Sequence, residues 1–288
     1  MATQVPRPAI AVRNLRWLHG FREVLVVAAI YITYSVVRSL SGDAADAAVT
    51  RAEDLVRLQQ QWRLNWEPDI QAWTLDRLPL MHIANFIYFW LHLPLLPIFA
   101  LWMFVTNPRS YSFLRNVWVI TQLIGVTAFF FIPVAPPRLL PDGYGFVDSM
   151  ALYSPINYTT SEAGMLVNKY AAFPSLHFAW SFIIAVGLYQ TLPWRWTRLL
   201  ALVVPVASFW SIVATGNHFV ADALGGAIVV AVGFLMAFGI DRLLSSRRRQ
   251  QADRHVPAEA RQIGRRRAGT ESDDELAPGY GHQAYRPK

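Results

Sequence analysis

Long apolar stretches alternate with short polar ones along most of the chain. Six of them have the length and composition of membrane-spanning helices: residues 21–40, 83–105, 117–135, 174–192, 199–214 and 219–240. A helix crosses a bilayer with about 20 mostly apolar residues. The fourth stretch contains Ser, Gln and Tyr and the fifth is short, which is typical of helices that pack on other helices. The pattern predicts an all-α, polytopic membrane bundle of about six transmembrane helices.

The first stretch has a second interpretation. Four arginines between Arg7 and Arg22 precede it and small residues follow it, as in a cleaved signal peptide. Because the basic region is long and the cleavage site is poor, the sequence favours an uncleaved anchor.

The segment between the first two spans, residues 44–80, mixes charged residues with apolar ones that include Trp62, Trp66 and Trp73. Tryptophan favours the membrane–water interface, so an amphipathic segment lying in that interface is predicted. An ordinary surface helix on the membrane domain fits the same pattern.

Composition agrees with a membrane protein and narrows the chemistry. Hydrophobic residues make up 54% of the 288 residues and charged residues 16%, whereas a soluble domain carries about a quarter charged residues. There is no cysteine, which excludes disulfides, thiolate metal sites and cysteine nucleophiles.

The net charge of +7 is concentrated at one end. Residues 242–288 hold 11 Lys and Arg against 6 Asp and Glu. The positive-inside rule explains this better than nucleic-acid binding, so no nucleic-acid partner is expected.

These patterns divide the chain into a cytoplasmic N-terminal segment (1–20), a membrane-embedded domain (21–241) and a basic cytoplasmic tail (242–288). The tail lacks apolar periodicity and is expected to be disordered. With six spans, the arginine-bearing loops 107–115 and 193–198 lie on the same side as both termini. That side is therefore predicted to be the cytoplasmic face of a plasma membrane.

Polar residues suited to chemistry gather at three span ends. Arg138 follows the third span, Ser175 and His177 open the fourth, and His218 and Asp222 open the sixth. Because successive spans alternate in direction, these three ends share one membrane face. The five residues can therefore meet, on the extracytoplasmic side according to the arginine distribution.

Residue types at this junction suit phosphate chemistry. Asp222 is one helical turn from His218 and can fix its tautomer, which leaves the other ring nitrogen as a nucleophile or base. Helix N-termini at Pro174 and Asn217 favour anions, and Arg138 adds a planar fork for phosphate oxygens. The plainer alternatives are a surface His–Asp pair and an arginine that anchors a helix end.

Two of these patches resemble motifs of the type 2 phosphatidic acid phosphatase superfamily of membrane enzymes. FPSLH, ending at His177, is similar to PSGH, with Leu176 in place of Gly. The run from Ser211 to Asp222 is similar to SR-x5-H-x3-D, with Ile212 in place of Arg.

The first motif of that superfamily, K-x6-RP, is matched only in part. Arg138 fits the arginine, whereas Phe131 and Leu139 stand where the lysine and proline would be. These departures, together with APPR, AAFPSLH and NHFVAD, resemble the inositolphosphotransferase branch, which includes inositol phosphorylceramide synthases. The resemblance covers roughly residues 34–226.

The resemblance implies a role for each matching residue. His218 would attack phosphorus and form a phosphohistidine, and Asp222 would orient it. His177 would protonate the leaving oxygen and later activate the acceptor. Arg138 and Ser175 would hold the phosphate oxygens, and neither a cofactor nor a metal would be needed.

The missing Lys and second Arg favour one substrate class. A site with fewer cations suits a singly charged phosphodiester better than a phosphate monoester, although Lys169 could compensate as a further phosphate-binding residue. The leading hypothesis is therefore transfer of a phosphate-containing group from a lipid to an alcohol acceptor. The alternatives are a hydrolytic phosphatidate or polyprenyl phosphate phosphatase, and a non-catalytic lipid-binding protein or carrier. Lipid substrate and membrane lipids are the expected partners, and no oligomeric state is predicted.

Overall fold

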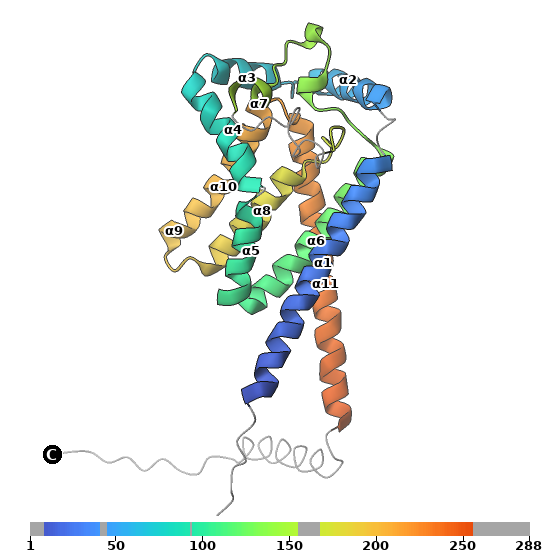
Figure 1. Ribbon diagram of the computed structural model, residues 1–288, viewed down its shortest axis with the longest axis vertical. Coiled ribbons are helices and arrows are strands. Elements are labelled where there is room, and N and C mark those ends of the chain that lie inside the picture. The colour runs from blue at the N-terminus through green and yellow to red at the C-terminus, as the bar shows by residue number, and fades with distance from the viewer. Residues whose placement is uncertain (1–8, 41–44, 93, 155–167, 256–288) are drawn as a thin grey trace, which may run out of the picture. The chain divides into compact units, whose positions relative to one another are not determined.

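The computed structural model describes residues 9–40, 45–92, 94–154 and 168–255, and almost all of them are helical (Figure 1). Within these ranges the β-structure is limited to a single bridge between Val134 and Ala171. The longest helices are α1 (Ala9–Leu40), α6 (Pro108–Phe131) and α11 (Val220–His255). The predicted all-α membrane bundle is confirmed.

The described residues contain four segments long and apolar enough to cross a membrane: Gly20–Ser39, Pro108–Phe131, Arg195–Ala214 and Val220–Arg247. The third combines α9 (Arg195–Leu199), η4 (Leu200–Leu202) and α10 (Val203–Ala214). A fifth is possible if α4 (Leu78–His92) and α5 (Leu95–Thr106), which meet at a 46° bend, form one span. The bend lies at Pro94, whose missing N–H cannot continue a helix.

The remaining predicted span corresponds to α8 (Leu176–Thr191), a helix of 16 residues. Its length of about 24 Å is less than the roughly 30 Å of a hydrocarbon core. It packs against α4, α5, α6 and α10, and its buried residues share the largest core cluster with residues of α5, α6 and α11. The short helix is therefore an inner element of the bundle.

The predicted interfacial segment forms two helices, α2 (Ala45–Gln61) and α3 (Glu67–Leu75). Figure 1 shows both lying across the upper end of the bundle. Ala48, Ala52 and Val56 are buried in a cluster with residues of the loops before α8 and α11. Trp62 and Trp73 are 70% and 51% exposed. One face of the segment thus packs on the loops at this end, and the other presents tryptophan.

Between α6 and α8 the helices of the described chain are short: η1 (Pro137–Leu139), η2 (Asp142–Tyr144) and α7 (Ser149–Tyr153).

The last helix, α11, continues to His255, past the boundary predicted after residue 241. No Gly or Pro follows Gly239 until Pro257, and Arg and Gln favour helix. The chain divides into two compact units, 1–238 and 239–288, and the rest of the predicted tail lies outside the described residues.

The start of α11 approaches α8 so closely that a side chain is excluded. A Cβ on Gly226 would clash with the carbonyl oxygen of Ser175. We expect Gly226→Ala to lower the free energy of unfolding by about 1–3 kcal/mol through overpacking, measured as a fall in Tm in detergent. Gly239→Ala is the matched control, because a Cβ there meets nothing within 4 Å. An unchanged Tm in the Gly226 variant would contradict the close approach.

Candidate active site

The span ends that carry the predicted residues meet at one point. Nδ1 of His177, at the start of α8, lies 3.1 Å from Nε2 of His218, just before α11. Nδ1 of His218 lies 3.3 Å from Oδ2 of Asp222. The Nε–H group of Arg138 donates to Asn217 Oδ1 at 2.9 Å. The side chains of four of the six residues singled out in the sequence therefore meet, directly or through Asn217, and Ser175 joins them through a backbone bond to Asp222.

A tight turn between α10 and α11 places His218. Gly216 has φ +70°, and a Cβ there would lie 2.9 Å from Nε2 of Gln71. Gln71 donates to the carbonyl of Ala214 at 3.1 Å, which ties the turn to α3. The backbone N–H groups of Asn217 and His218 both donate to the carbonyl of Ile212. His218 is 3% exposed, so the turn fixes a nearly buried ring.

Hydrogen bonding determines the tautomer of His218. Its Nδ1 lies 2.9 Å from the carbonyl oxygen of Ala172 and 3.3 Å from the carboxylate of Asp222. Both partners are acceptors, so Nδ1 carries the proton and Nε2 keeps its lone pair. The Nδ1–H of His177 is then the donor in the contact with His218 Nε2. Such an Nε2 is equipped to act as a nucleophile.

Aromatic side chains hold the ring of His177. Its centroid lies 4.9 Å from that of Tyr88 and 5.5 Å from that of Trp180. The indole N–H of Trp180 donates to Gln122 Oε1 at 2.8 Å. Because the two histidines are in hydrogen-bond contact, a phosphoryl group can enter between them only by replacing that bond.

Arg138 is fixed from three directions. Besides the bond to Asn217, its Nη1 donates to Asp148 Oδ2 at 3.2 Å, and its backbone N–H donates to the carbonyl of Gly216 at 2.9 Å. Asp148 also accepts the N–H of Ala151 at the start of α7. The guanidinium is therefore oriented toward the histidines' end of α11, and its charge is partly offset by Asp148.

Ser175 and Lys169 occupy different surroundings. Ser175 is completely buried; its hydroxyl accepts the N–H of Phe178 at 3.3 Å and caps α8, while its own N–H donates to the carbonyl of Asp222 at 2.9 Å. Lys169 is exposed and lines the cavity described below. The contacts of Ser175 join the starts of α8 and α11, and its predicted role as a phosphate ligand stays a prediction.

The N-terminus of α11 corrects one expectation. The sequence suggested that its free N–H groups would bind phosphate. Instead, Phe219 N–H donates to Asp222 Oδ2 at 2.8 Å, Val220 N–H to Glu67 Oε1 at 2.6 Å and Ala221 N–H to Gln59 Oε1 at 2.8 Å. These three groups are occupied by side chains, two of which come from the segment predicted to lie in the interface.

A cavity of about 410 Å³ extends from the two histidines between α1, α6 and α8. Arg138 and Asn217 lie beside the rings, and Lys169 also lines the cavity. Toward the membrane-spanning helices it is mostly apolar and aromatic, with Val27, Ile30, Tyr31, Tyr34, Trp118, Gln122, Phe129 and Trp180 among its lining residues. The cavity can therefore take a molecule with an anionic head and an apolar chain.

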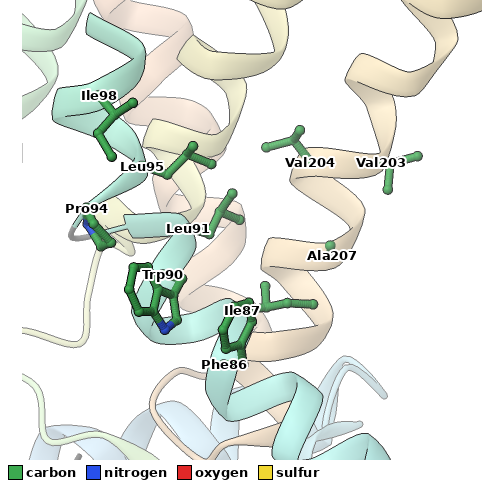
Figure 2. A pocket seen from close by; sticks show the side chains of 10 residues that line it. All are labelled: Phe86, Ile87, Trp90, Leu91, Pro94, Leu95, Ile98, Val203, Val204 and Ala207. Atoms are coloured by element: carbon green, nitrogen blue, oxygen red, sulfur yellow. The ribbon is translucent and has the colours of Figure 1, made fainter. Parts of the chain in front are cut away.

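A second hollow, of about 450 Å³, lies between α4, α5 and α10 (Figure 2). Phe86, Trp90 and Leu95 line it on one side, and Val203 and Ala207 on the other. Apart from the indole N–H of Trp90 its lining side chains are apolar, so it offers no charged group to hold phosphate.

The described residues include no group of three or more His, Asp or Glu side chains arranged to hold a metal ion. The site chemistry available on these residues is that of two imidazoles, a carboxylate and a guanidinium.

Comparison with known families agrees with this geometry. A family model described as the PAP2 superfamily matches residues 53–236, almost two thirds of the chain. The chain belongs to the PAP2 superfamily. No curated protein and no solved structure matches it. Membership supports an enzyme of the lipid phosphatase and phosphotransferase class that acts on lipid phosphates in a membrane, and it confirms the superfamily resemblance seen in the motifs.

Proposed function

We propose that this PAP2 superfamily protein cleaves a lipid-linked phosphoester through a phosphohistidine on His218. The observation that carries the proposal is the bonding of that ring: Nδ1–H is held by Ala172 and Asp222, and Nε2 faces the cavity and His177. A buried imidazole with a fixed tautomer and a second nitrogen that keeps its lone pair suits nucleophilic catalysis.

The two steps follow from the positions of the rings. Nε2 of His218 attacks phosphorus while the bond from phosphorus to the leaving oxygen breaks. His177, acting from its doubly protonated form, gives its Nδ1 proton to that oxygen and becomes a neutral imidazole. His177, now a base, then takes the proton of an acceptor hydroxyl, which attacks phosphorus and releases His218. Asp222 stabilises the positive ring of the intermediate, and Arg138 stabilises the charge on the phosphate oxygens.

The shape of the cavity favours a lipid substrate over a small soluble ester. Its cationic end lies at the histidines, and its apolar part runs along helices that are themselves candidate spans. A phosphorylated lipid matches both parts, with its phosphate at the rings and its chain between α1, α6 and α8.

Charge at the site favours a phosphodiester donor and an alcohol acceptor over hydrolysis of a monoester. Arg138 is already paired with Asp148. Ile212, at the position of the arginine in SR-x5-H-x3-D, is fully buried, and Phe131, at the position of the lysine in K-x6-RP, is 67% exposed. Neither position supplies a cation, which supports an inositolphosphotransferase-like activity. Hydrolysis of phosphatidate or polyprenyl phosphate is the second candidate, because Lys169 lines the cavity and adds a positive charge.

Product identity tests this choice. Purified protein would be incubated with a lipid phosphate monoester and a phosphodiester, each labelled on phosphorus, with and without an inositol-type acceptor. We expect the label of the diester to appear on the acceptor. Release of inorganic phosphate from the monoester, with no transfer product from the diester, would establish the hydrolase instead.

Arg138→Lys should lower kcat/KM by about 10²–10³-fold, because an ammonium cannot present the planar fork to phosphate. Arg51→Lys is the matched control. Its guanidinium donates to the carbonyl of Pro133, a few residues from Arg138, and lies outside the cavity. Equal activities in the two variants would remove Arg138 from the proposed site.

We also propose that the site faces the extracytoplasmic side of a plasma membrane. The arginines of residues 107–115 and 193–198 support this. The first group lies at the start of α6, whose other end leads to Arg138, and the second follows α8, whose first turn carries His177.

A further inference from the structure

One buried carboxylate takes no part in the mechanism described above. Glu67, the first residue of α3, has no exposed surface, and the ion pairs among the described residues do not include it. Its Oε1 accepts the N–H of Val220 at 2.6 Å, from a residue 153 positions later in the chain. Burying an acidic group is costly unless it is well bonded, so its placement at this helix start calls for a reason.

Gln59 repeats the arrangement from a second helix. It is 2% exposed on α2, and its Oε1 accepts the N–H of Ala221 at 2.8 Å. The first turn of a helix leaves its N–H groups without partners inside the helix, and caps for them usually come from adjacent residues. Here Asp222 supplies the local cap at Phe219, and the next two N–H groups are held from α3 and α2.

These bonds act directly beside the nucleophile. His218 immediately precedes the capped residues, and its Nδ1 is bonded to Asp222 in the same turn. A shift of that turn would move Nε2 relative to His177 and to the phosphate. The carboxylate also offsets the partial positive charge of the helix start, which would otherwise oppose a positive ring on His218. Burial raises the pKa of Glu67, while the bond from Val220 acts in the opposite direction.

We propose that Glu67 and Gln59 are positioning residues for His218, and that they hold the first turn of α11 from the two helices that precede the catalytic bundle. The inference rests on the proposed role of His218. It gives the tryptophan-bearing segment α2–α3 a part in catalysis in addition to any contact with the membrane surface.

Kinetics of four variants test this inference. Glu67→Ala should lower kcat by about 10²-fold, the order of loss expected for a misplaced reacting group, while KM stays within about twofold because Arg138 and the cavity are untouched. Glu67→Gln keeps an acceptor oxygen and should recover at least about tenfold of that loss. Gln59→Ala should lower kcat by a smaller factor. Asp69→Asn, an exposed acid on the same helix, is the matched control and should behave as the parent protein.

Several outcomes would overturn the inference. A Glu67→Ala protein with the parent kcat would do so, as would a Glu67→Gln protein as slow as the Ala variant or a change confined to KM. If Glu67→Ala fails to fold, Gln59→Ala and Glu67→Gln carry the test, with Tm in the same detergent as the check on folding. Activity retained in His218→Ala would overturn the proposed function itself. An inactive His218→Ala protein, together with fully active Glu67 and Gln59 variants, would overturn only the positioning role.

Discussion

Replacing His218 with Ala should lower turnover of the lipid substrate by a factor on the order of 10⁴ or more, as expected when a covalent nucleophile is removed. The ring's Nε2 is the nitrogen that faces both the cavity and His177. The bundle should persist, because the turn is held by backbone bonds to Ile212 that the substitution leaves in place. The measurement is lipid turnover by purified protein. Transfer of the phosphorus label from the lipid to the protein is a second readout.

His82→Ala is the control for that experiment. His82 is an exposed histidine on α4 whose Nδ1 contacts the carbonyl of Tyr153, and its loss should leave turnover within about threefold of the parent. Persistent turnover and persistent labelling in His218→Ala would reject the nucleophile. A parent protein with no turnover and no labelling would instead favour the non-catalytic lipid-binding protein or carrier.

His177→Ala should lower turnover by about 10²–10⁴-fold, the usual contribution of a general acid and base. The loss should depend on the leaving group. In single-turnover experiments, an ester with a nitrophenol leaving group, which departs without protonation, should form the phosphoenzyme nearly as fast in the variant as in the parent. An ester whose leaving group is a lipid alkoxide should form the phosphoenzyme much more slowly in the variant than in the parent.

Release of the group from His218 should stay slow in that variant with either ester, because the acceptor hydroxyl still needs a base. His82→Ala, whose ring lies outside the cavity, is again the control. An equal loss of phosphoenzyme formation with both esters would show that His177 does not act as the acid.

The sequence predicted that the span ends would meet, because successive spans run in opposite directions and these ends therefore share one membrane face. Arg138, His177, His218 and Asp222 mark those ends, and their contacts follow once the helices pack. The break at Pro94 could have been anticipated from proline alone, yet the surrounding apolar run predicted one span. Helix length in the described residues therefore gives four or five candidate spans, with α8 as a shorter inner helix.

The partners of the site could not be predicted in the same way. Asp148 pairs with Arg138 from a loop without periodicity, and Glu67 and Gln59 reach α11 across more than 150 residues. Their side chains look like ordinary polar positions of an amphipathic segment. The sequence does show that Glu67 and Gln59 lie in a segment that also contains apolar residues. It does not show which face of that segment packs inward, because that depends on tertiary structure.

The hydrogen bond between the two rings has a consequence for the empty enzyme. The lone pair of Nε2 is the part of the His218 ring that attacks phosphorus in the proposed mechanism. In this protein the lone pair of His218 is shielded by the N–H of His177 and by burial. The reactive atom is thus masked at rest, and it is uncovered only when an anionic phosphoryl oxygen competes for the same hydrogen.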